Sequence, residues 1–253
     1  MKHLFCVESE QELARYCAFA DMAMPRLEAY AEYIANAFEV RELPRAVIWT
    51  SLDAATHLIS DIPVPAYTNE FRVVIAPELD VWRQIYLKQL DGVQISEDNA
   101  NIVNAVTDYY RNELSDNYVL QILGHELAHH SDLFLDDFNS PLSDGIWFEE
   151  GMVEYISRKY FLTEGEFAAE VENNRRIVSL LEGRYGAHSL EEFGASTYDG
   201  DYASIFFEYW RSFLAVNAIV QRHCGDVRSV FESYHEWNRF NSGMTLLKWF
   251  GLE

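Results

Sequence analysis

Two histidines near the middle of the chain have the spacing of a metal site. They lie four residues apart in the segment His125-Glu126-Leu127-Ala128-His129. Residues four apart on an α-helix lie one turn apart on the same face, so both imidazoles can approach a single point. Zinc prefers imidazole nitrogens and carboxylate oxygens, and a catalytic zinc has three protein ligands and one water. The segment therefore predicts two of the three ligands of a catalytic zinc ion.

The third ligand must come from another segment, and Glu150 is the preferred candidate. It is expected on a second helix after a loop, and its neighbour Glu149 is the alternative ligand. Glu126 lies about 100° around the helix axis from the first histidine. There it could take a proton from a metal-bound water as a general base. Glu154 follows Glu150 by one helical turn and is expected to accept a ring N–H of a ligand histidine, which would hold the tautomer.

The H-E-x-x-H segment and the E-G-x-x-E-Y segment that begins at Glu150 together resemble the gluzincins, zinc metallopeptidases of the thermolysin and aminopeptidase N type. The matched part spans roughly residues 115–160, with a weaker likeness in the helix after Tyr198. The resemblance implies that Glu126 is the base and that Glu154 orients a ligand histidine. The positions that match the family's zinc ligands are His125, His129 and Glu150.

Other features of the chain limit which properties of zinc metallopeptidases the resemblance implies. The metzincin pattern requires Gly and His beyond the second histidine, where this chain has Asp132 and Leu135, so that branch is excluded. No Gly-x-Met-Glu-Asn segment precedes the histidines, so the recognition of a free amino terminus by aminopeptidase N is not implied. Gluzincins also use a Tyr or His to stabilise the oxyanion. The resemblance implies Tyr202 in this role, with Tyr198 as the alternative, and such a donor is worth about 3 to 4 kcal/mol of barrier.

Neighbouring polar residues are not expected to bind the metal. His130 follows the second ligand directly and is turned about 100° away from the ligand side. His3 and His57 have no second donor at ligand spacing and are expected to be structural or solvent-facing. Three aspartates of the loop after the motif are expected to be solvated, namely Asp132, Asp136 and Asp137.

The order of the predicted elements gives an α+β fold of the zincin-like kind. A small mixed sheet is expected in the N-terminal half together with the H-E-x-x-H helix, followed by a mostly helical C-terminal half. Residues 1–253 are expected to form a single peptidase unit, with lobes 1–135 and 136–253. The expected strands cover Arg45–Ser51 and Phe71–Ala76, with an irregular or edge segment at Pro63 and Pro65 between them. The expected helices cover Leu13–Phe38 with a kink or break at Pro25, Pro77 to about Leu90, Ser96–Asn112, Tyr202–His223, Asp226–Asn238 and Met244–Phe250, and Gly151 is expected to allow close helix packing.

The amino-acid composition limits which partners the protein is expected to bind and which cellular compartment it is expected to occupy. The formal net charge is −22, with 41 acidic against 19 basic residues, so nucleic acid and anionic membrane surfaces would be repelled. The acidic surplus is expected to serve solubility. Three cysteines without C-x-x-C spacing are expected to be reduced and mostly buried thiols, and no signal-peptide core or membrane-span run is seen. We therefore expect a cytoplasmic protein.

These observations favour a zinc-dependent metallopeptidase that hydrolyses peptide bonds with one Zn²⁺ ion and a glutamate base. The expected partner is a peptide or protein substrate. Two other functions remain open: a catalytically silent zincin-like protein that serves binding or regulation, and a zinc hydrolase that acts on a non-peptide amide. The sequence does not distinguish endopeptidase from exopeptidase action, and it leaves the oligomeric state open.

Overall fold

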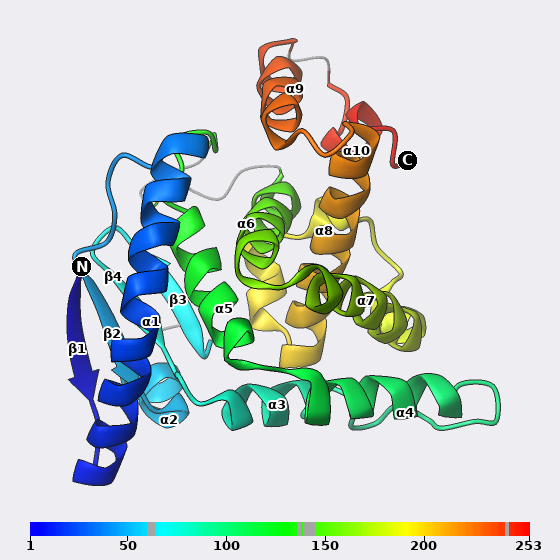
Figure 1. Cartoon of the computed structure of the whole chain (residues 1–253). Coiled ribbons are helices and arrows are strands. Elements are labelled where there is room, and N and C mark those ends of the chain that lie inside the picture. Colours follow the sequence, from blue (N-terminus) through cyan, green and yellow to red (C-terminus); the bar gives the residue numbers. More distant parts are fainter. Residues whose placement is uncertain (60–63, 136–137, 139–144, 241–242) are drawn as a thin grey trace.

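A small sheet and a larger group of helices make up the molecule (Figure 1). The computed structural model describes residues 1–59, 64–135, 138, 145–240 and 243–253. Helices account for 66% of the described residues, so the predicted α+β fold with a small mixed sheet in the N-terminal part is confirmed. The strands are β1 (Lys2–Cys6), β2 (Ala46–Thr50), β3 (Ala66–Asn69) and β4 (Arg72–Ile75).

The sheet has the strand order β1-β2-β4-β3 among the described residues. β2 pairs in parallel with both β1 and β4, and β3 pairs antiparallel with β4. The two central strands are apolar, and Val47 of β2 and Val73 of β4 are completely buried. β3 begins directly after Pro65 and lies at the sheet edge, as the prolines favoured; Pro63 lies outside the described residues. β1 was not predicted, because five residues with alternating exposure give only a weak signal.

Helix α1 (Glu10–Ala37) lies across the sheet and beside the motif helix (Figure 1). Ser9 is its N-cap, and the Ser9 hydroxyl accepts the backbone N–H of Glu12 at 3.2 Å. A kink or a break was predicted at Pro25. The structure contradicts the break, because α1 is one continuous helix through this residue. A buried face that runs from Tyr16 to Ile34 packs against the sheet and α5, and this packing offsets the backbone hydrogen bond that proline cannot make.

The other predicted helices are confirmed with small shifts of their ends. A capping box at Thr163 begins α7, as the pattern Thr163-Glu164-Gly165-Glu166 predicts. The longer helices are α3 (Leu79–Lys88), α4 (Ala100–Asp108), α5 (Asp116–Ala128), α6 (Ile146–Phe161), α7 (Glu164–Tyr185), α8 (Tyr202–Arg222) and α9 (Val227–Phe240), and α10 (Leu246–Trp249) is a single short turn. The short helical elements are α2 (Leu52–Ala54), η1 (Ala55–Ile59), η2 (Tyr109–Glu113), η3 (Leu190–Glu192) and η4 (Ala195–Asp199).

Three helices form the centre of the molecule. α5 packs against α6, and α6 packs against α8 on its other side. Every residue of α5 from Tyr118 to Ala128 is buried, which leaves no solvent-facing side on the motif helix. A Cβ added at Gly151 of α6 would lie 2.5 Å from the backbone oxygen of Ser212 on α8, so the predicted close approach at Gly151 is confirmed. Buried residues of both proposed lobes belong to one core, and the division into lobes stays a prediction.

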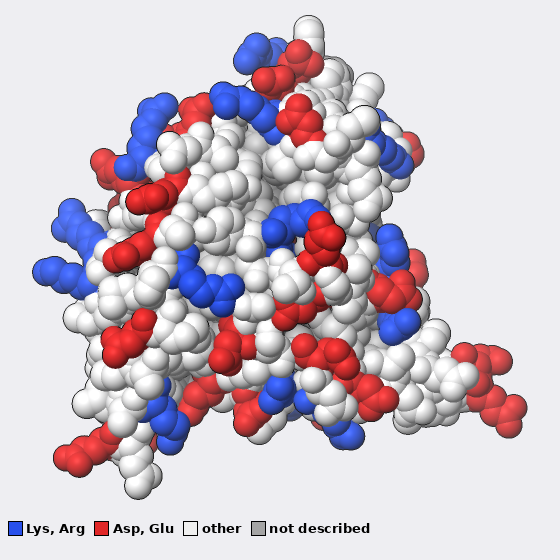
Figure 2. Space-filling view, viewed as in Figure 1, with Lys and Arg blue, Asp and Glu red and all other residues white. Residues whose placement is uncertain are grey.

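The surface charges, the helices and the exposure of the cysteines can be compared with the expectations drawn from the composition. Acidic and basic side chains are interspersed over the visible face (Figure 2). Among the described residues, no helix has the length and apolar character needed to span a membrane. The three cysteines are free, but the expectation that they are mostly buried was wrong: Cys6 and Cys224 are exposed and Cys17 is partly exposed. Cys6 ends an edge strand and Cys224 lies in a left-handed turn after α8, and neither position faces the core.

Candidate metal centre

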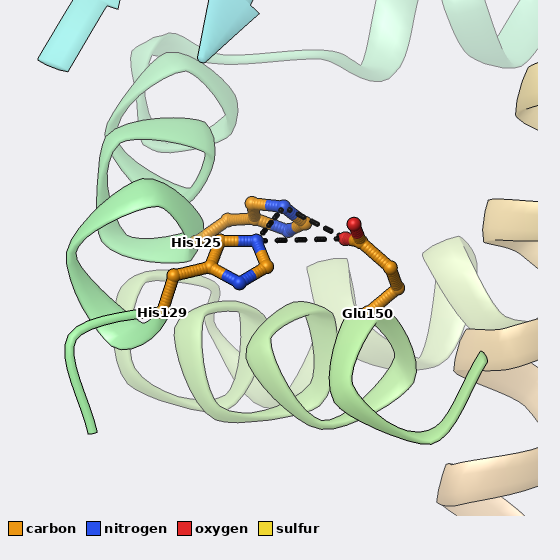
Figure 3. A group of neighbouring side chains, drawn as sticks. All are labelled: His125, His129 and Glu150. Carbon is orange, nitrogen blue, oxygen red and sulfur yellow. Dashed lines mark hydrogen bonds and ion pairs between the residues drawn. The ribbon is translucent and has the colours of Figure 1, made fainter. Parts of the chain in front are cut away.

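The end of α5 and the start of α6 bring two imidazoles and one carboxylate together (Figure 3). His125 Nε2 and His129 Nε2 are 3.2 Å apart. Glu150 Oε2 lies 3.3 Å from His125 Nε2 and 3.5 Å from His129 Nε2. All three side chains are at least 86% buried, since the most exposed of them, His129, has a side-chain exposure of 14%. The three atoms therefore form a nearly equilateral triangle in the protein interior.

The outer nitrogens of both rings face carboxylates. Glu149 Oε1 lies 2.9 Å from His129 Nδ1, and Glu154 Oε1 lies 3.4 Å from His125 Nδ1. Because an ionised carboxylate only accepts hydrogen bonds, we assign the ring protons to the two Nδ1 atoms. The Nε2 lone pairs then point at each other and at Glu150 Oε2. When both rings are neutral, as metal ligands must be, three acceptor atoms converge with no proton between them.

This arrangement fits a zinc ion. A tetrahedral zinc with bonds of about 2.0 to 2.1 Å holds its ligand atoms about 3.3 to 3.4 Å apart, and the three observed separations are 3.2, 3.3 and 3.5 Å. Glu150 Oε2 is buried and has no hydrogen-bond partner among the described residues. An unpaired buried acceptor costs free energy unless a donor or a cation satisfies it. A divalent cation at this point would satisfy all three atoms.

The charges around the triangle also favour a cation. Burial opposes charge on the rings, but the neighbouring Glu150 and Glu154 carboxylates raise the pKa of His125 to about 9. The pKa of His129 is raised in the same way by Glu150 and Glu149, against the effect of burial. Burial also opposes charge on Glu150, yet the two histidines hold its pKa well below the usual range. Positive charge at the centre of the triangle is thus strongly favoured.

Glu126 lies beside this cluster in the wall of a cavity of about 80 Å³. His125 shares that wall, and the rest of it is largely apolar or aromatic, including Trp82, Phe206 and Trp210. Burial raises the pKa of Glu126 from its ordinary value of 4.5 to about 7. A carboxylate and a ring of the metal cluster thus face one space that a small part of a substrate could enter.

Two tyrosines contact the carboxylate of Glu150, and neither of them is Tyr202, the preferred candidate for the oxyanion donor. Tyr209 and Tyr198 place their hydroxyl oxygens 3.1 and 3.3 Å from Glu150 Oε1. Tyr202 lines the cavity with Glu126, two turns before Tyr209 on α8. Tyr198 was the alternative from sequence, whereas Tyr209 was not selected. Its seven-residue spacing from Tyr202, which places both on one helix face, was the available signal.

The other polar candidates lie outside the cluster. His130 Nε2 contacts Thr68 Oγ1 at 3.1 Å. Asp132 is half-exposed and pairs with Arg41, as a solvated loop residue would, whereas Asp136 and Asp137 lie outside the described residues. His3 accepts the indole N–H of Trp49 at 2.9 Å, and His57 is exposed beside Asp53. None of these described side chains joins the triangle.

The fold and the cluster define the class of the protein. An H-E-x-x-H helix packed against a second helix that supplies a carboxylate is typical of a zinc-dependent hydrolase. Residues 90–253, well over half of the chain and the whole of the cluster, match the model of the peptidase M9 family, described as collagenase. The chain therefore belongs to the collagenase family of zinc metallopeptidases. No curated protein and no solved structure matches the chain.

Proposed function

We propose that the chain is a gluzincin-type peptidase that holds one zinc ion through His125, His129 and Glu150. The observation that carries this proposal is the buried triangle of Nε2, Nε2 and Oε2 atoms with edges of 3.2 to 3.5 Å. The membership of a zinc metallopeptidase family supports the choice of metal and of peptide substrates. Three protein ligands leave one position of a tetrahedral ion for a reactant.

Glu126 is the proposed general base. Zinc, when bound, supplies a Lewis acid that polarises a substrate carbonyl and lowers the pKa of a water molecule. Glu126 is buried next to the first ligand histidine and faces the cavity. From there it takes the proton of the attacking water, and its surroundings exclude bulk solvent that would compete for that proton.

The carboxylates behind the rings hold the ligands in the required tautomer. Glu149 accepts the Nδ1–H of His129, and Glu154 lies on the Nδ1 side of His125. Arg158 in turn contacts Glu154 through Nε at 2.7 Å and lies within 3.4 Å of Glu170 on α7. A chain of charged contacts from Glu154 through Arg158 to Glu170 thus holds His125 of α5 and links it to α6 and α7.

The test compares the parent with Glu126→Gln and with Glu172→Gln, a control on the exposed face of α7. Zinc content after dialysis and cleavage of a peptide library are measured for each protein. We expect all three to retain zinc, and we expect only Glu126→Gln to lose turnover, by about 100-fold or more. A Glu126→Gln protein that keeps zinc and cleaves as fast as the parent would remove the assigned base.

The same measurements separate the rival functions. A parent that binds zinc tightly but cleaves no peptide would favour a binding or regulatory role. Zinc-dependent cleavage of small amides without cleavage of peptides would favour a hydrolase with a non-peptide substrate.

A further inference from the structure

Glu150 uses only one of its oxygens toward the histidines. Oε2 faces both Nε2 atoms (Figure 3), while Oε1 faces α8 and the segment before it, which carry Tyr209 and Tyr198. The hydroxyl oxygens of Tyr209 and Tyr198 lie 3.1 and 3.3 Å from Oε1. The two hydroxyls are also 3.0 Å from each other. Oε1 is therefore surrounded by phenolic groups.

Counting protons decides how these groups are connected. Each phenol carries one proton, so two protons serve three contacts and only two of the contacts are hydrogen bonds at any time. The two shortest contacts form a relay in which Tyr198 donates to Tyr209 and Tyr209 donates to Glu150 Oε1. Tyr209 is the member with a direct bond in this relay, and Tyr198 supports it.

Tyr209 is well placed to hold the carboxylate rigidly. It lies on α8, which packs tightly against α6 at Gly151, the residue next to Glu150. Its ring packs 5.5 Å from the ring of Phe193 and 6.0 Å from the imidazole of His125. A hydroxyl on such a fixed ring loses little freedom when it forms its hydrogen bond.

We propose that Tyr209 is a positioning residue that keeps Glu150 a one-oxygen ligand. By occupying Oε1, it prevents this oxygen from turning toward the ion and filling the position that a reactant needs. The inference rests on the proposed ligand set. It also assigns Tyr209 a role different from that of Tyr202 or Tyr198 as an oxyanion donor, because a positioning residue acts on metal binding before any substrate is present.

The experiment measures the binding of zinc alone, by competition with a chromophoric chelator, and the absorption spectrum of the cobalt-substituted protein. The variants are Tyr209→Phe and the double variant with Tyr198→Phe. We expect the double variant to bind zinc about 10-fold more weakly than the parent, as is usual when a partner of a ligand is removed. We also expect its cobalt bands to weaken, because a second oxygen of Glu150 raises the coordination number above four.

Tyr16→Phe is the matched control. The Tyr16 hydroxyl of α1 also contacts a glutamate carboxylate, at 3.1 Å from Glu78 Oε2, and neither residue belongs to the metal cluster. This variant should leave zinc affinity and the cobalt spectrum unchanged. Metal-free thermal unfolding of each variant checks that the fold is intact; the exchange of tyrosine for phenylalanine removes one oxygen and keeps the ring.

The outcomes separate the two proposals. A parent that binds no zinc, or a Glu150→Ala variant that binds it as tightly as the parent, would overturn the ligand set and the inference with it. A parent that binds zinc and a double variant that matches it within twofold, with the same cobalt spectrum, would overturn only the role of Tyr209. Weaker zinc binding in Tyr209→Phe and in the double variant, with Tyr16→Phe unchanged, supports it.

Discussion

Substitution of Gly151 by alanine should damage both the packing of α6 on α8 and the metal centre. The added Cβ would lie 2.5 Å from the backbone oxygen of Ser212, whereas ordinary van der Waals contact begins at 3.4 Å. The obstacle is backbone, which cannot move aside as a flexible side chain would. The helices would therefore have to separate locally by about 0.9 Å.

This separation has two measurable costs. Overpacking of a tight core contact destabilises by about 1 to 3 kcal/mol, and each kcal/mol lowers the Tm of a domain of this size by about 2 to 4 °C. The hydroxyl of Tyr209 on α8 lies 3.1 Å from Glu150 Oε1 on α6. An added 0.9 Å would lengthen this contact to about 4 Å, beyond hydrogen-bond range. Zinc affinity should then fall by about 10-fold.

Thermal unfolding and zinc titration of Gly151→Ala test this reasoning, with Gly183→Ala as the control. Gly183 lies in α7, and a Cβ there meets no atom within 4 Å among the described residues. Alanine at Gly183 should leave zinc affinity unchanged and stabilise α7 by up to about 1 kcal/mol. A Gly151→Ala protein with the Tm and the zinc affinity of the parent would refute the close approach of the two helices.

Four further predictions concern the metal, the charges and the proposed oxyanion donor. Removal of zinc with a chelator should lower stability by about 4 kcal/mol relative to a protein with free zinc at 1,000 times its Kd, and Glu150→Ala should abolish this difference in a thermal scan. Arg158→Ala leaves buried carboxylates without their cation, so urea unfolding should show a loss of about 3 to 5 kcal/mol. Burial opposes charge on Glu166, but hydrogen bonding to the Thr163 backbone lowers the pKa of Glu166 below 4.5. The ionised carboxylate therefore stabilises the fold above that pH, and this contribution is lost as the pH falls. Glu166→Gln should make the decline of stability between about pH 5 and 3 less steep. Tyr202→Phe should lower kcat by about 100-fold or more with zinc affinity unchanged if Tyr202 stabilises the oxyanion, and an unchanged kcat would exclude it.

The parts of the site that depend on local spacing were predictable from the sequence. His125 and His129 converge because four residues make one helical turn, and this holds wherever the helix is placed. Glu150 was preferred over Glu149 from the resemblance and not from local spacing, because neighbours on a helix differ by about 100° and the choice depends on how α6 is rotated against α5. The structure places Glu150 Oε2 between the two Nε2 atoms and Glu149 on the outer nitrogen of His129.

The parts that depend on packing between distant segments were not predictable. Tyr209 reaches Glu150 because α8 returns to pack on α6, and its spacing from Tyr202 shows only that the two tyrosines share a helix face, not which helix that face approaches. β1 was missed for a similar reason, since its pairing with β2 joins segments more than 40 residues apart. The continuity of α1 through Pro25 likewise reflects burial of one helix face, which local propensity does not include.

The C-terminal end of α5 lies beside the N-terminal end of α6 at the metal cluster, and the partial charges of these two helix ends affect its chemistry. His125 lies in the last turn of α5 and His129 is its C-cap, whereas Glu149 lies in the first turn of α6. Peptide dipoles leave partial negative charge at the end of one helix and partial positive charge at the start of the next, worth about 0.3 to 1 kcal/mol at each terminus. The backbone itself therefore draws a cation to the imidazole side and keeps the carboxylate side ionised, before any side chain is counted.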